Sequence, residues 1–591
     1  MDQLYHSLDI VDASTYRDFV AAEHNTPSNV IRDGMRFSLA FIITYQYSLL
    51  ALTALFTARH CLNVLSRTRR TLCHQVDVSI ESRIQHGDLP ADTEHLKSAV
   101  LDEHTSLLVG RRQKRPALYQ RTARRWRSLF IHHPTWLREL PGNDISFFVF
   151  LLAGLNLFYA LYNAPLSRPV IYVFADRVGL LFVANLPWLY LLGAKNQPFR
   201  LLTGSSYEGL NILHRSLGKW LAILAALHTV GMVIVWYDYL LPRGLGLWWY
   251  LTRNIIWLGI SALLCYEVLS LTSLVSFRQW WYEMFLACHI VLQAGGLIFL
   301  FFHFPRTRPY VLVSLSIFLL DRLWYRLTLK TRSFVTDLTI MEDGQTVMVS
   351  ASWALQPWSR ALSWLVPRDV RYGWNATDHV FLTVPALSGK HKMQAHPFTI
   401  ASAAPAKDHT HAWLSLIIRV RDGFTRDLLE HAKLNTTATV RLDGPYGSDH
   451  ALEMLLVSDL SVVVAGGSGI AVAFPLIWEL LHAPRARLSV CLIWIVNDAR
   501  HVKWIGYERI DELKQLGLRV VIPPPTAKAG RPDVPQLLRQ TLVDLTDGDL
   551  NCKTGLVVSG PDAMNRAVRN TCAQLAWDGM NISVAVEVFD W

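Results

Sequence analysis

The sequence predicts a multi-domain membrane protein in which a seven-span α-helical bundle is followed by an antiparallel β-barrel and a Rossmann-like α/β domain. Three observations support this fold class. Apolar runs of about 20 residues, the length that crosses a bilayer, occur only before residue 328. Short apolar strands and turns follow up to residue 450, as in small barrels. From residue 460 strands alternate with helical segments, which favours a parallel sheet covered by helices.

Seven apolar runs are candidate membrane spans. They lie at 37–57, 145–164, 177–194, 211–236, 254–275, 282–304 and 309–327. The N-terminal residues lack the charged-then-apolar layout of a signal peptide. The chain is therefore divided into an extracytoplasmic segment (1–35), a first span with a basic cytoplasmic loop (36–144), the remaining spans (145–328), the barrel (329–452) and the α/β domain (453–591).

The net charge of +10 is concentrated in the loop after the first span, in RTRR (67–70), GRRQKRP (110–116) and RTARRWR (121–127). Basic residues beside spans mark the cytoplasmic side, so we expect the N-terminus outside and the C-terminal half in the cytosol. The charge then indicates a lipid bilayer as partner and no nucleic acid, and we expect the loop to be solvated and to face lipid. The seven cysteines are scattered without a CxxC, which argues against a disulfide framework and a cysteine-based metal site.

Two of the predicted spans carry paired histidines. His214 and His228 are fourteen residues apart, and so are His289 and His303. Fourteen residues is close to four helical turns, so each pair projects from one face, with about 21 Å between its members along the axis. Both helices run in the same direction, which places His214 level with His289 and His228 level with His303. Opposed histidines at one depth can ligate a haem, so the spacing predicts two haems stacked across the membrane.

Other interpretations of these histidines exist. A single intramembrane histidine is often a neutral, hydrogen-bonded side chain, and proton relays also use histidines. Four histidines in two matched pairs are hard to obtain by packing alone, so we favour haem ligation. Arg177, Arg215 and Arg253 lie near span ends, where they could meet haem propionates or could equally be ordinary interfacial charges.

The soluble half contains two segments suited to cofactors. In SVVVAGGSGIAVAFPLIWELL, a buried strand, a glycine turn and a helix follow one another, and Gly466, Gly467 and Gly469 would let the backbone approach a pyrophosphate. A tight structural turn is the alternative, since Val472 departs from G-x-G-x-x-G. HPFTIAS (396–402) offers an imidazole, an aromatic face and hydroxyls, which suit a planar ring with phosphates.

Residues 145–591 resemble the fungal ferric-chelate reductases (ferric reductase transmembrane components) of the flavocytochrome b group, which also contains the NADPH oxidases. The resemblance is carried by DRVGLLFVANLPWLYLLGAKN (176–196), LTGSSYEGLNILHRSLGKW (202–220), the four histidines, HPFTIAS, GPYG (444–447), GGSGI (466–470), SGP (559–561) and the terminal VEVFDW.

The resemblance implies a set of cofactor-binding residues. His214, His228, His289 and His303 would ligate two b-type haems. FAD would be bound by His396, Pro397, Phe398, Thr399, Ser402, Gly444, Pro445 and Gly447. NADPH would be bound by Gly466, Gly467, Ser468, Gly469, Ser559, Gly560 and Pro561. In catalysis Thr399 would lie near the flavin ring, Ser559 near the nicotinamide, and Trp591 would stack near the flavin.

The sequence departs from the family pattern at several positions. Ser559 replaces a cysteine that usually lies by the hydride-transfer site, and we expect this replacement to preserve the backbone but to change the rate. Asn497 stands where an arginine often favours the NADPH phosphate, and Arg500 is a candidate substitute. ATD (376–378) replaces the usual Pro-Gly-Gln, and no hydroxyl residue follows GGSGI.

The expected activity is electron transfer from cytosolic NADPH through FAD and two haems to ferric or cupric chelates or siderophores across the membrane, in support of iron uptake. The alternative is an NADPH oxidase that produces superoxide. The extra N-terminal span and the equal histidine spacings resemble the reductases. A seven-span receptor would have no use for the cofactor-binding half. We expect a plasma-membrane or endomembrane (vacuolar) protein.

Overall fold

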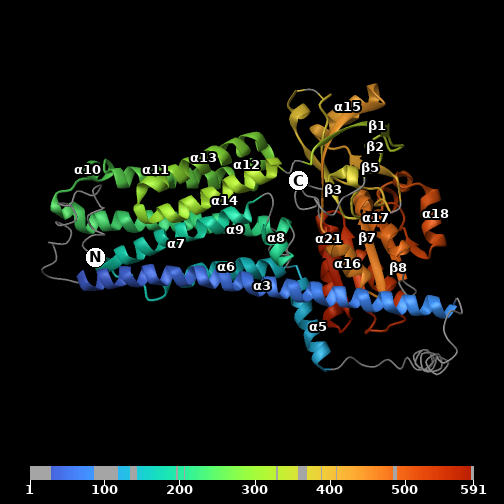
Figure 1. The fold of residues 1–591 in the computed structure, drawn as a ribbon, viewed down its shortest axis with the longest axis horizontal. Coiled ribbons are helices and arrows are strands. Elements are labelled where there is room, and N and C mark those ends of the chain that lie inside the picture. Colours follow the sequence, from blue (N-terminus) through green and yellow to red (C-terminus); the bar gives the residue numbers. More distant parts are fainter. Residues whose placement is uncertain are drawn as a thin grey trace. The chain divides into compact units, whose positions relative to one another are not determined.

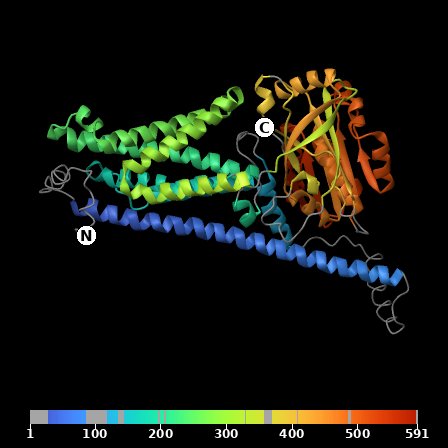
Figure 2. The same ribbon diagram turned by 45° about the horizontal axis from the view of Figure 1, so that its top comes forward.

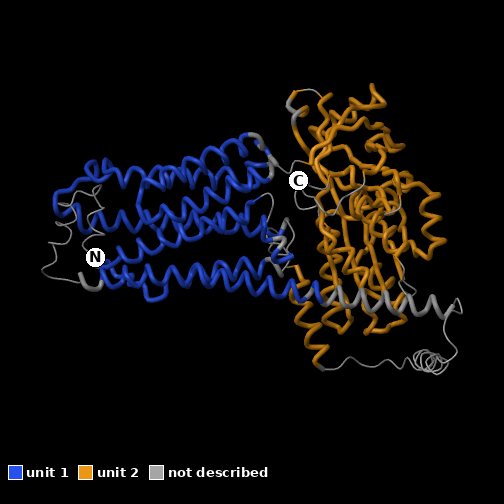
Figure 3. Tube along the Cα trace, viewed as in Figure 1, with its two compact units in different colours: residues 1–71, 145–326 blue, residues 72–144, 327–591 orange. Residues whose placement is uncertain are grey.

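The computed structural model describes residues 28–85, 118–133, 143–194, 198–204, 207–327, 330–356, 369–387, 389–406, 409–483 and 489–587. The chain forms two compact units (Figure 3). Unit 1 comprises residues 1–71 and 145–326, and unit 2 comprises residues 72–144 and 327–591.

Unit 1 is a bundle of long helices that run side by side (Figures 1 and 2). Its main helices are α3 (Ser28–Gln85), α6 (Asn143–Leu161), α7 (Ile171–Leu192), α9 (Tyr207–Val235), α11 (Asn254–Thr272), α13 (Tyr282–His303) and α14 (Arg308–Leu327). Short helices connect them: α8 (Pro198–Thr203), α10 (Leu247–Leu251) and α12 (Val275–Trp280). A helix therefore occupies each of the seven predicted ranges.

Five of the described helices are long and apolar enough to cross a membrane. They cover Ile31–Leu62, Ile171–Leu192, Gly209–Arg243, Asn254–Thr272 and Met284–His303. The apolar helix Ser146–Leu161 is shorter, and α14, which contains Arg308, Asp321, Arg322 and Arg326, is not among the five. A membrane-embedded helical unit follows from these five, and the count of seven spans stays a prediction.

Helix α7 is the core of the bundle, since two thirds of its apolar window is buried by protein. Such burial allows polar side chains within an apolar helix, provided that they find partners. Asn185 of α7 donates to Asn156 of α6 and accepts from the hydroxyl of Tyr45 of α3, at 2.8 and 2.6 Å. Asn156 in turn donates to the Tyr45 hydroxyl at 3.2 Å. This closed triangle of buried hydrogen bonds joins α3 to the bundle.

The first part of unit 2 is an antiparallel six-stranded sheet with the order β4-β3-β6-β1-β2-β5. The strands are β1 (Arg332–Ile340), β2 (Thr346–Ala354), β3 (His379–Thr383), β4 (His396–Thr399), β5 (His411–Arg419) and β6 (Thr437–Tyr446). An antiparallel bridge between Ile400 and Leu416 joins the two edges. The sheet thus closes into the predicted barrel, and α15 (Phe424–Leu434) packs Phe424 and Leu428 into its core.

The second part is a parallel five-stranded sheet with the order β11-β10-β7-β8-β9. Its strands are β7 (Leu460–Gly466), β8 (Ser489–Ile495), β9 (Leu518–Val521), β10 (Thr554–Ser559) and β11 (Ile582–Val586). Its helices are α16 (His450–Leu456), α17 (Ile470–His482), α18 (Tyr507–Gln515), α19 (Thr526–Ala529), α20 (Val534–Thr546) and α21 (Asp562–Trp577). The strand order reverses between β7 and β10, and such a switch point opens a crevice at the carboxyl ends of the strands.

The basic segment 58–144 differs from its prediction. Helix α3 continues through residues 58–85, where a loop was expected. A further helix, α5 (Leu118–Ile131), contains the whole of RTARRWR and buries one face against α21 instead of facing solvent and lipid. The prediction was wrong here because Arg124 was taken for a solvated charge, whereas its side chain is 9% exposed and bonded to the α/β domain.

Candidate functional site

The four histidines of α9 and α13 form two facing pairs. The ring centroids of His214 and His289 are 6.4 Å apart, and those of His228 and His303 are also 6.4 Å apart. A metal–imidazole bond of about 2 Å, with the nitrogen about 1 Å from its ring centre, places two rings that share one metal about 6 Å apart. Both pairs therefore have the separation that a single bound iron requires.

Each histidine is oriented by its other ring nitrogen. Nδ1 of His228 donates to the carbonyl of Ala175 at 2.7 Å, and Nδ1 of His214 donates to Leu189 at 3.0 Å. Nδ1 of His303 donates to the carbonyl of Ile255 at 2.6 Å. Because a carbonyl can only accept, these bonds leave Nε2 with its lone pair, as metal-ligating histidines require.

The fourth histidine uses a side-chain acceptor. Nδ1 of His289 lies 3.4 Å from the hydroxyl of Ser273, which itself donates to the carbonyl of Leu269 at 2.6 Å. The serine oxygen is thus left to accept from the imidazole. All four rings therefore have a partner that fixes the same tautomer.

Small residues on the neighbouring helices leave room for the rings. A Cβ atom on Gly179 would stand 2.7 Å from Nδ1 of His228, and one on Gly193 would stand 2.9 Å from Cε1 of His214. On α11, a Cβ atom on Gly259 would stand 2.6 Å from Cε1 of His303. Only glycine fits at such distances.

These supporting residues repeat at the interval of the histidines. Gly179 and Gly193 on α7 are fourteen residues apart, and so are Gly259 and Ser273 on α11. At the three glycines the carbonyl that accepts from the histidine lies four residues earlier, as with Ala175 before Gly179. The four histidines, their tautomer and the space around them thus fit two haems, one at each level.

The three arginines considered as partners of haem propionates differ in burial and in the groups that they contact. Arg177 is fully buried, and it donates to the hydroxyl of Ser38 at 2.9 Å and to the carbonyl of Tyr162 at 2.5 Å. It ties α7 to its neighbours, so the propionate role does not suit it. Arg253 lies over the ring of Trp249 at 3.7 Å, whereas Arg215 is exposed beside His214.

In the barrel, β3 brings the two predicted FAD motifs together. Thr399 of HPFT and Tyr446 of GPYG pair with the same residue, His379, from opposite sides. All four residues of β4 are partly exposed, so this edge of the barrel is open to a ligand. The ring of His396 packs against Phe424, the first residue of α15, at 4.2 Å. The N-terminus of that helix, which favours negative charge, therefore lies beside the motif.

Three further residues of the FAD set have structural partners. Ser402 accepts a hydrogen bond from the backbone of Ser415 at 3.1 Å, which secures the barrel closure. A Cβ atom on Gly444 would stand 2.9 Å from Val380, and one on Gly447 would collide with Asp378. The turn ATD thus fills the place of the usual Pro-Gly-Gln by packing against GPYG.

The two glycine turns of the α/β domain meet at the switch point. Ser559 at the end of β10 pairs with Ala465 near the end of β7. Gly466 would place a Cβ atom 2.9 Å from Pro561, and Gly469 would place one in collision with the carbonyl oxygen of Ser559. GGSG and SGP are therefore back to back at the carboxyl edge of the sheet, where a pyrophosphate would find backbone N–H groups.

Sequence reasoning missed a cation at this place. Arg419 at the end of β5 has its Nη1 atom 3.9 Å from where a Cβ of Gly467 would stand. It brings a positive charge from the barrel to the glycine turn. The basic run IIRVRDG (417–423) was the only sequence signal, and it resembles any exposed strand end.

Two family models match the chain. A ferric reductase like transmembrane component matches residues 178–300, which contain all of the described histidine supports except Ala175, and an FAD-binding domain matches residues 354–450. Both matches make the chain similar to proteins of the flavocytochrome b/NADPH oxidase type.

Several curated proteins similar to this chain are fungal. A probable cell surface ferric reductase of Aspergillus oryzae is 28% identical, with 56% of this chain and 45% of the relative covered. Ferric reductase transmembrane component 1 of Schizosaccharomyces pombe is 25% identical, with coverage of 55% and 60%. Ferric/cupric reductase transmembrane component 7 of Saccharomyces cerevisiae is also 25% identical, with coverage of 64% and 60%. The chain thus spans about half the length of these relatives.

Solved structures of soluble flavoproteins also match. A flavohaemoglobin from Malassezia yamatoensis has 14% identity and a TM-score of 0.35, with 72% of this chain and 98% of that chain covered. A ferredoxin-NADP+ reductase from Plasmodium falciparum has 13% identity and a TM-score of 0.30, with coverage of 44% and 96%.

Arg500, the candidate partner of the NADPH phosphate, forms a closed pair with Asp498. Nε and Nη2 of Arg500 donate to Asp498, and these bonds lower the pKa of the Asp498 carboxyl to about 2. Nη1 of Arg500 donates to the carbonyl of Glu342 at 3.1 Å. Asn497 accepts from Thr526 at 2.9 Å. Arg500 is thus already bonded where it was expected to meet the NADPH phosphate.

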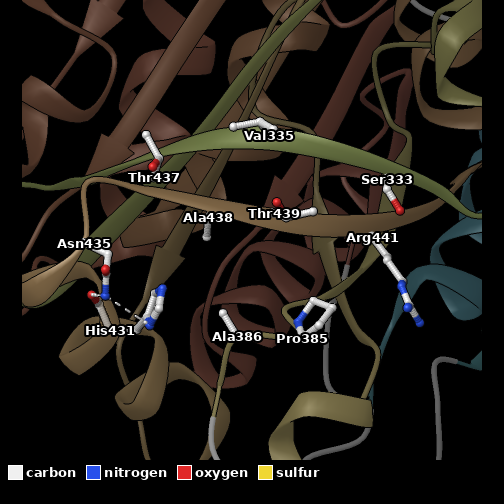
Figure 4. A pocket seen from close by; sticks show the side chains of 10 residues that line it. All are labelled: Ser333, Val335, Pro385, Ala386, His431, Asn435, Thr437, Ala438, Thr439 and Arg441. Carbon is white, nitrogen blue, oxygen red and sulfur yellow. Dashed lines mark hydrogen bonds between the residues drawn. The ribbon is translucent and has the colours of Figure 1, made fainter.

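Trp591 falls outside the described residues. A pocket on the outer face of the barrel contains none of the motif residues (Figure 4). It is lined by Ser333, Val335, Pro385, Ala386, His431, Asn435, Thr437, Ala438, Thr439 and Arg441.

Proposed function

We propose that this chain is a transmembrane metalloreductase that takes electrons from NADPH in the cytosol and delivers them to ferric or cupric chelates on the other side. The observation that carries the proposal is the pair of histidine levels, each with ring centroids 6.4 Å apart. When bound, NADPH, FAD and two b-type haems would supply the hydride and one-electron chemistry. The seven-span topology with a cytosolic C-terminal half belongs to the same proposal.

The residues of the chain would hold each cofactor in place. His214 and His289 would hold one haem, and His228 and His303 the other, at levels about 21 Å apart along the helices. His228 and His303 would both be committed to the outer haem, so a chelate or oxygen would take its electron without binding to the iron, by outer-sphere transfer. HPFT and GPYG would hold FAD, with Thr399 at the flavin ring.

The glycine turns GGSG and SGP would hold the pyrophosphate and nicotinamide of NADPH, with Ser559 beside the hydride-transfer site and Trp591 at the flavin. The names of the relatives support metal as acceptor, since they are ferric and ferric/cupric reductases. Support of iron uptake, and siderophores among the substrates, are part of the proposal.

The deciding experiment supplies NADPH to membranes that contain the protein and follows ferrous iron formed from a ferric chelate, with and without oxygen and superoxide dismutase. We expect reduction that persists without oxygen and is unaffected by the dismutase. Reduction that needs oxygen and disappears with the dismutase would identify superoxide as the product and the protein as an oxidase. A His303→Ala variant, which loses an outer-level ligand, should abolish chelate reduction while the inner haem is still reduced by NADPH.

A further inference from the structure

The carboxyl end of β8 lies beside the glycine turn of the α/β domain. Gly466, the first glycine of the turn, pairs with Ile495 at the end of β8. The indole N–H of Trp494 donates to the carbonyl of Gly467 at 3.1 Å. In doubly wound folds the residues after this second strand face the adenosine ribose, where an acidic side chain accepts from the 2′-hydroxyl of NADH and an arginine receives the 2′-phosphate of NADPH. Residues 496–500 therefore occupy the position at which the ribose is read.

An acidic residue, Asp498, stands at this position. Its side chain is 31% exposed, so a ribose can reach it. Oδ1 accepts from the backbone N–H of Arg500 at 2.9 Å, and Oδ2 accepts from Nε and Nη2 of the same residue at 3.0 and 2.6 Å. These bonds lower the pKa of the carboxyl to about 2, and a carboxylate has about four acceptor positions. Asp498 is thus ionised at physiological pH and keeps an acceptor position for one hydroxyl.

The neighbouring arginine is held by two segments of the chain. Besides Asp498, Arg500 contacts the turn between β1 and β2, where its Nη1 donates to the carbonyl of Glu342 at 3.1 Å. A 2′-phosphate carries about two negative charges, and at Arg500 it would lie next to the Asp498 carboxylate, which repels it. Arg500 therefore neutralises Asp498 and does not present its guanidinium to a phosphate.

The second cation of this segment is also engaged. Nζ of Lys503 donates to both carboxylate oxygens of Glu342, at 2.6 and 2.7 Å. Asp343, the next residue of the same turn, lies 3.5 Å from Nε2 of His501. Burial lowers the pKa of His501, so this imidazole is neutral at pH 7. The three acidic residues at the end of β8 thus outnumber its two cations, which disfavours the binding of a further dianion.

Asn497, which stands where an arginine was expected, is bonded to the short helix α19. Its side-chain oxygen accepts from the hydroxyl of Thr526 at 2.9 Å, and its carbonyl accepts from the N–H of Ala527 at 3.1 Å. The same helix contains Lys528, which is exposed. Lys528 is therefore the alternative partner for a 2′-phosphate among the described residues of this edge.

We propose that the ribose subsite at the end of β8 accepts NADH as well as NADPH, with Asp498 as the residue that binds the 2′-hydroxyl and Arg500 as the residue that positions Asp498. The inference rests on the proposed function, since it concerns which nucleotide reduces the flavin. NADH gains a charge-assisted hydrogen bond here, whereas NADPH gains no binding from its 2′-phosphate. The two nucleotides differ only at this position of the adenosine ribose, so the hydride transfer itself is the same for both.

The test compares ADP-ribose with 2′-phospho-ADP-ribose, which differ only in the 2′-phosphate and donate no hydride. Their dissociation constants for the full-length protein in detergent are measured by isothermal titration calorimetry. Flavin reduction by NADH and by NADPH is followed without oxygen in the same preparation. We expect dissociation constants that differ by less than about fivefold, equivalent to about 1 kcal/mol, and flavin reduction by both nucleotides. A larger preference for the phosphorylated ligand would overturn the proposal.

Three variants locate the residue that reads the ribose. Asp498→Asn should weaken the binding of ADP-ribose about tenfold, the scale of a hydrogen bond to a charged group, and should not weaken that of 2′-phospho-ADP-ribose. Asp511→Asn, which removes an exposed acidic partner of Lys514 on α18, is the matched control and should change neither constant. Lys528→Ala should also change neither.

Two outcomes with these variants would contradict the proposal. A selective loss of 2′-phospho-ADP-ribose binding in Lys528→Ala would assign the phosphate to that lysine. Unchanged binding of ADP-ribose in Asp498→Asn would remove the carboxylate from the subsite. A flavin that neither nucleotide reduces would instead refute the proposed function, since the binding of the two ligands is measured without hydride transfer.

Discussion

Gly193 of α7 lies so close to His214 of α9 that a Cβ atom there would stand 2.9 Å from the imidazole. The same imidazole donates to the carbonyl of Leu189, one turn earlier on α7. The absence of a Cβ atom at Gly193 and the hydrogen bond to Leu189 therefore act together, because the His214 ring reaches that carbonyl only where no Cβ atom intervenes.

The substitution Gly193→Ala should remove the haem of the His214/His289 level and spare the other level. The added methyl group forces the ring away from its carbonyl partner, which disorients a ligand that second-sphere bonds normally fix. Haem per protein, measured as pyridine haemochrome, should fall by about half. The matched control is Gly154→Ala in α6, where no atom lies within 4 Å of the added carbon. Full haem content in Gly193→Ala would show that the contact is dispensable.

The substitution Asn185→Leu should loosen α3 from the bundle. It leaves the buried Tyr45 hydroxyl and the Asn156 amide with fewer partners, at a cost of about 1 kcal/mol or more for membrane-embedded bonds. Thermal unfolding of the detergent-solubilised protein should shift to lower temperature. Thr53→Ala is the control, because that hydroxyl bonds only within its own helix, to Leu49. Equal unfolding temperatures for the two variants would contradict a role of the triangle in holding α3.

The substitution Gly469→Ala should impair the reaction with NADPH alone. Its Cβ atom would meet the backbone of Ser559, so the GGSG and SGP turns would have to separate. We expect kcat/KM for NADPH to fall about tenfold, equivalent to about 1.4 kcal/mol. Chelate reduction by haem that has been reduced chemically should be normal. Ser489→Ala, at the exposed start of β8, is the control. A variant that also loses the chemically driven step would point to general misfolding.

Asp369 provides a pH-dependent contribution to stability. Burial raises the pKa of its carboxyl, but hydrogen bonds from Arg371 and Arg332 outweigh that effect, so the pKa lies below its ordinary value of 3.8. A lowered pKa in the folded state means that the stabilisation is complete above about pH 4 and is lost as the pH falls through the folded-state pKa.

We therefore expect Asp369→Asn to lower the free energy of unfolding by about 2 kcal/mol at pH 7, the scale of hydrogen bonds to a charged group. The difference from the wild type should shrink below pH 4. Asp422→Asn removes an exposed ion pair with Arg426 and should cost little at any pH. A deficit of Asp369→Asn that is the same at pH 7 and at pH 3 would exclude the ionised carboxylate as its cause.

The features that could be predicted from the sequence are those that one short, contiguous stretch of residues reveals. The four histidines stand out because polar side chains are rare in apolar helices, and the glycine turn GGSG follows a recognisable buried strand. The supports of the histidines were not predicted, because Gly179 and Gly259 look like ordinary small residues until α7 and α11 are placed beside α9 and α13. Their repeat at the histidine interval was nevertheless present in the sequence.

The errors have a common physical origin. Arg177 was expected to meet a haem propionate or to be an interfacial charge, and Arg124 was expected to be solvated. A guanidinium can nevertheless be buried when polar groups from other segments converge on it. The carbonyls among these groups come from Tyr162 in one case and from Gly579 and Leu550 in the other. Convergence of backbone groups from distant segments is invisible to a reading along the chain.

The repeat of fourteen residues on both the histidine helices and the supporting helices makes the spacing of the two histidine levels independent of bilayer thickness. A membrane that is thinner or thicker than the bundle is accommodated by tilt or by deformation of the lipid. Because each level is fastened to the same pair of rigid helices at the same interval, such a tilt carries both levels together. The distance between the two levels then depends on the helical rise alone. The protein should therefore transfer electrons at similar rates in membranes of different lipid composition.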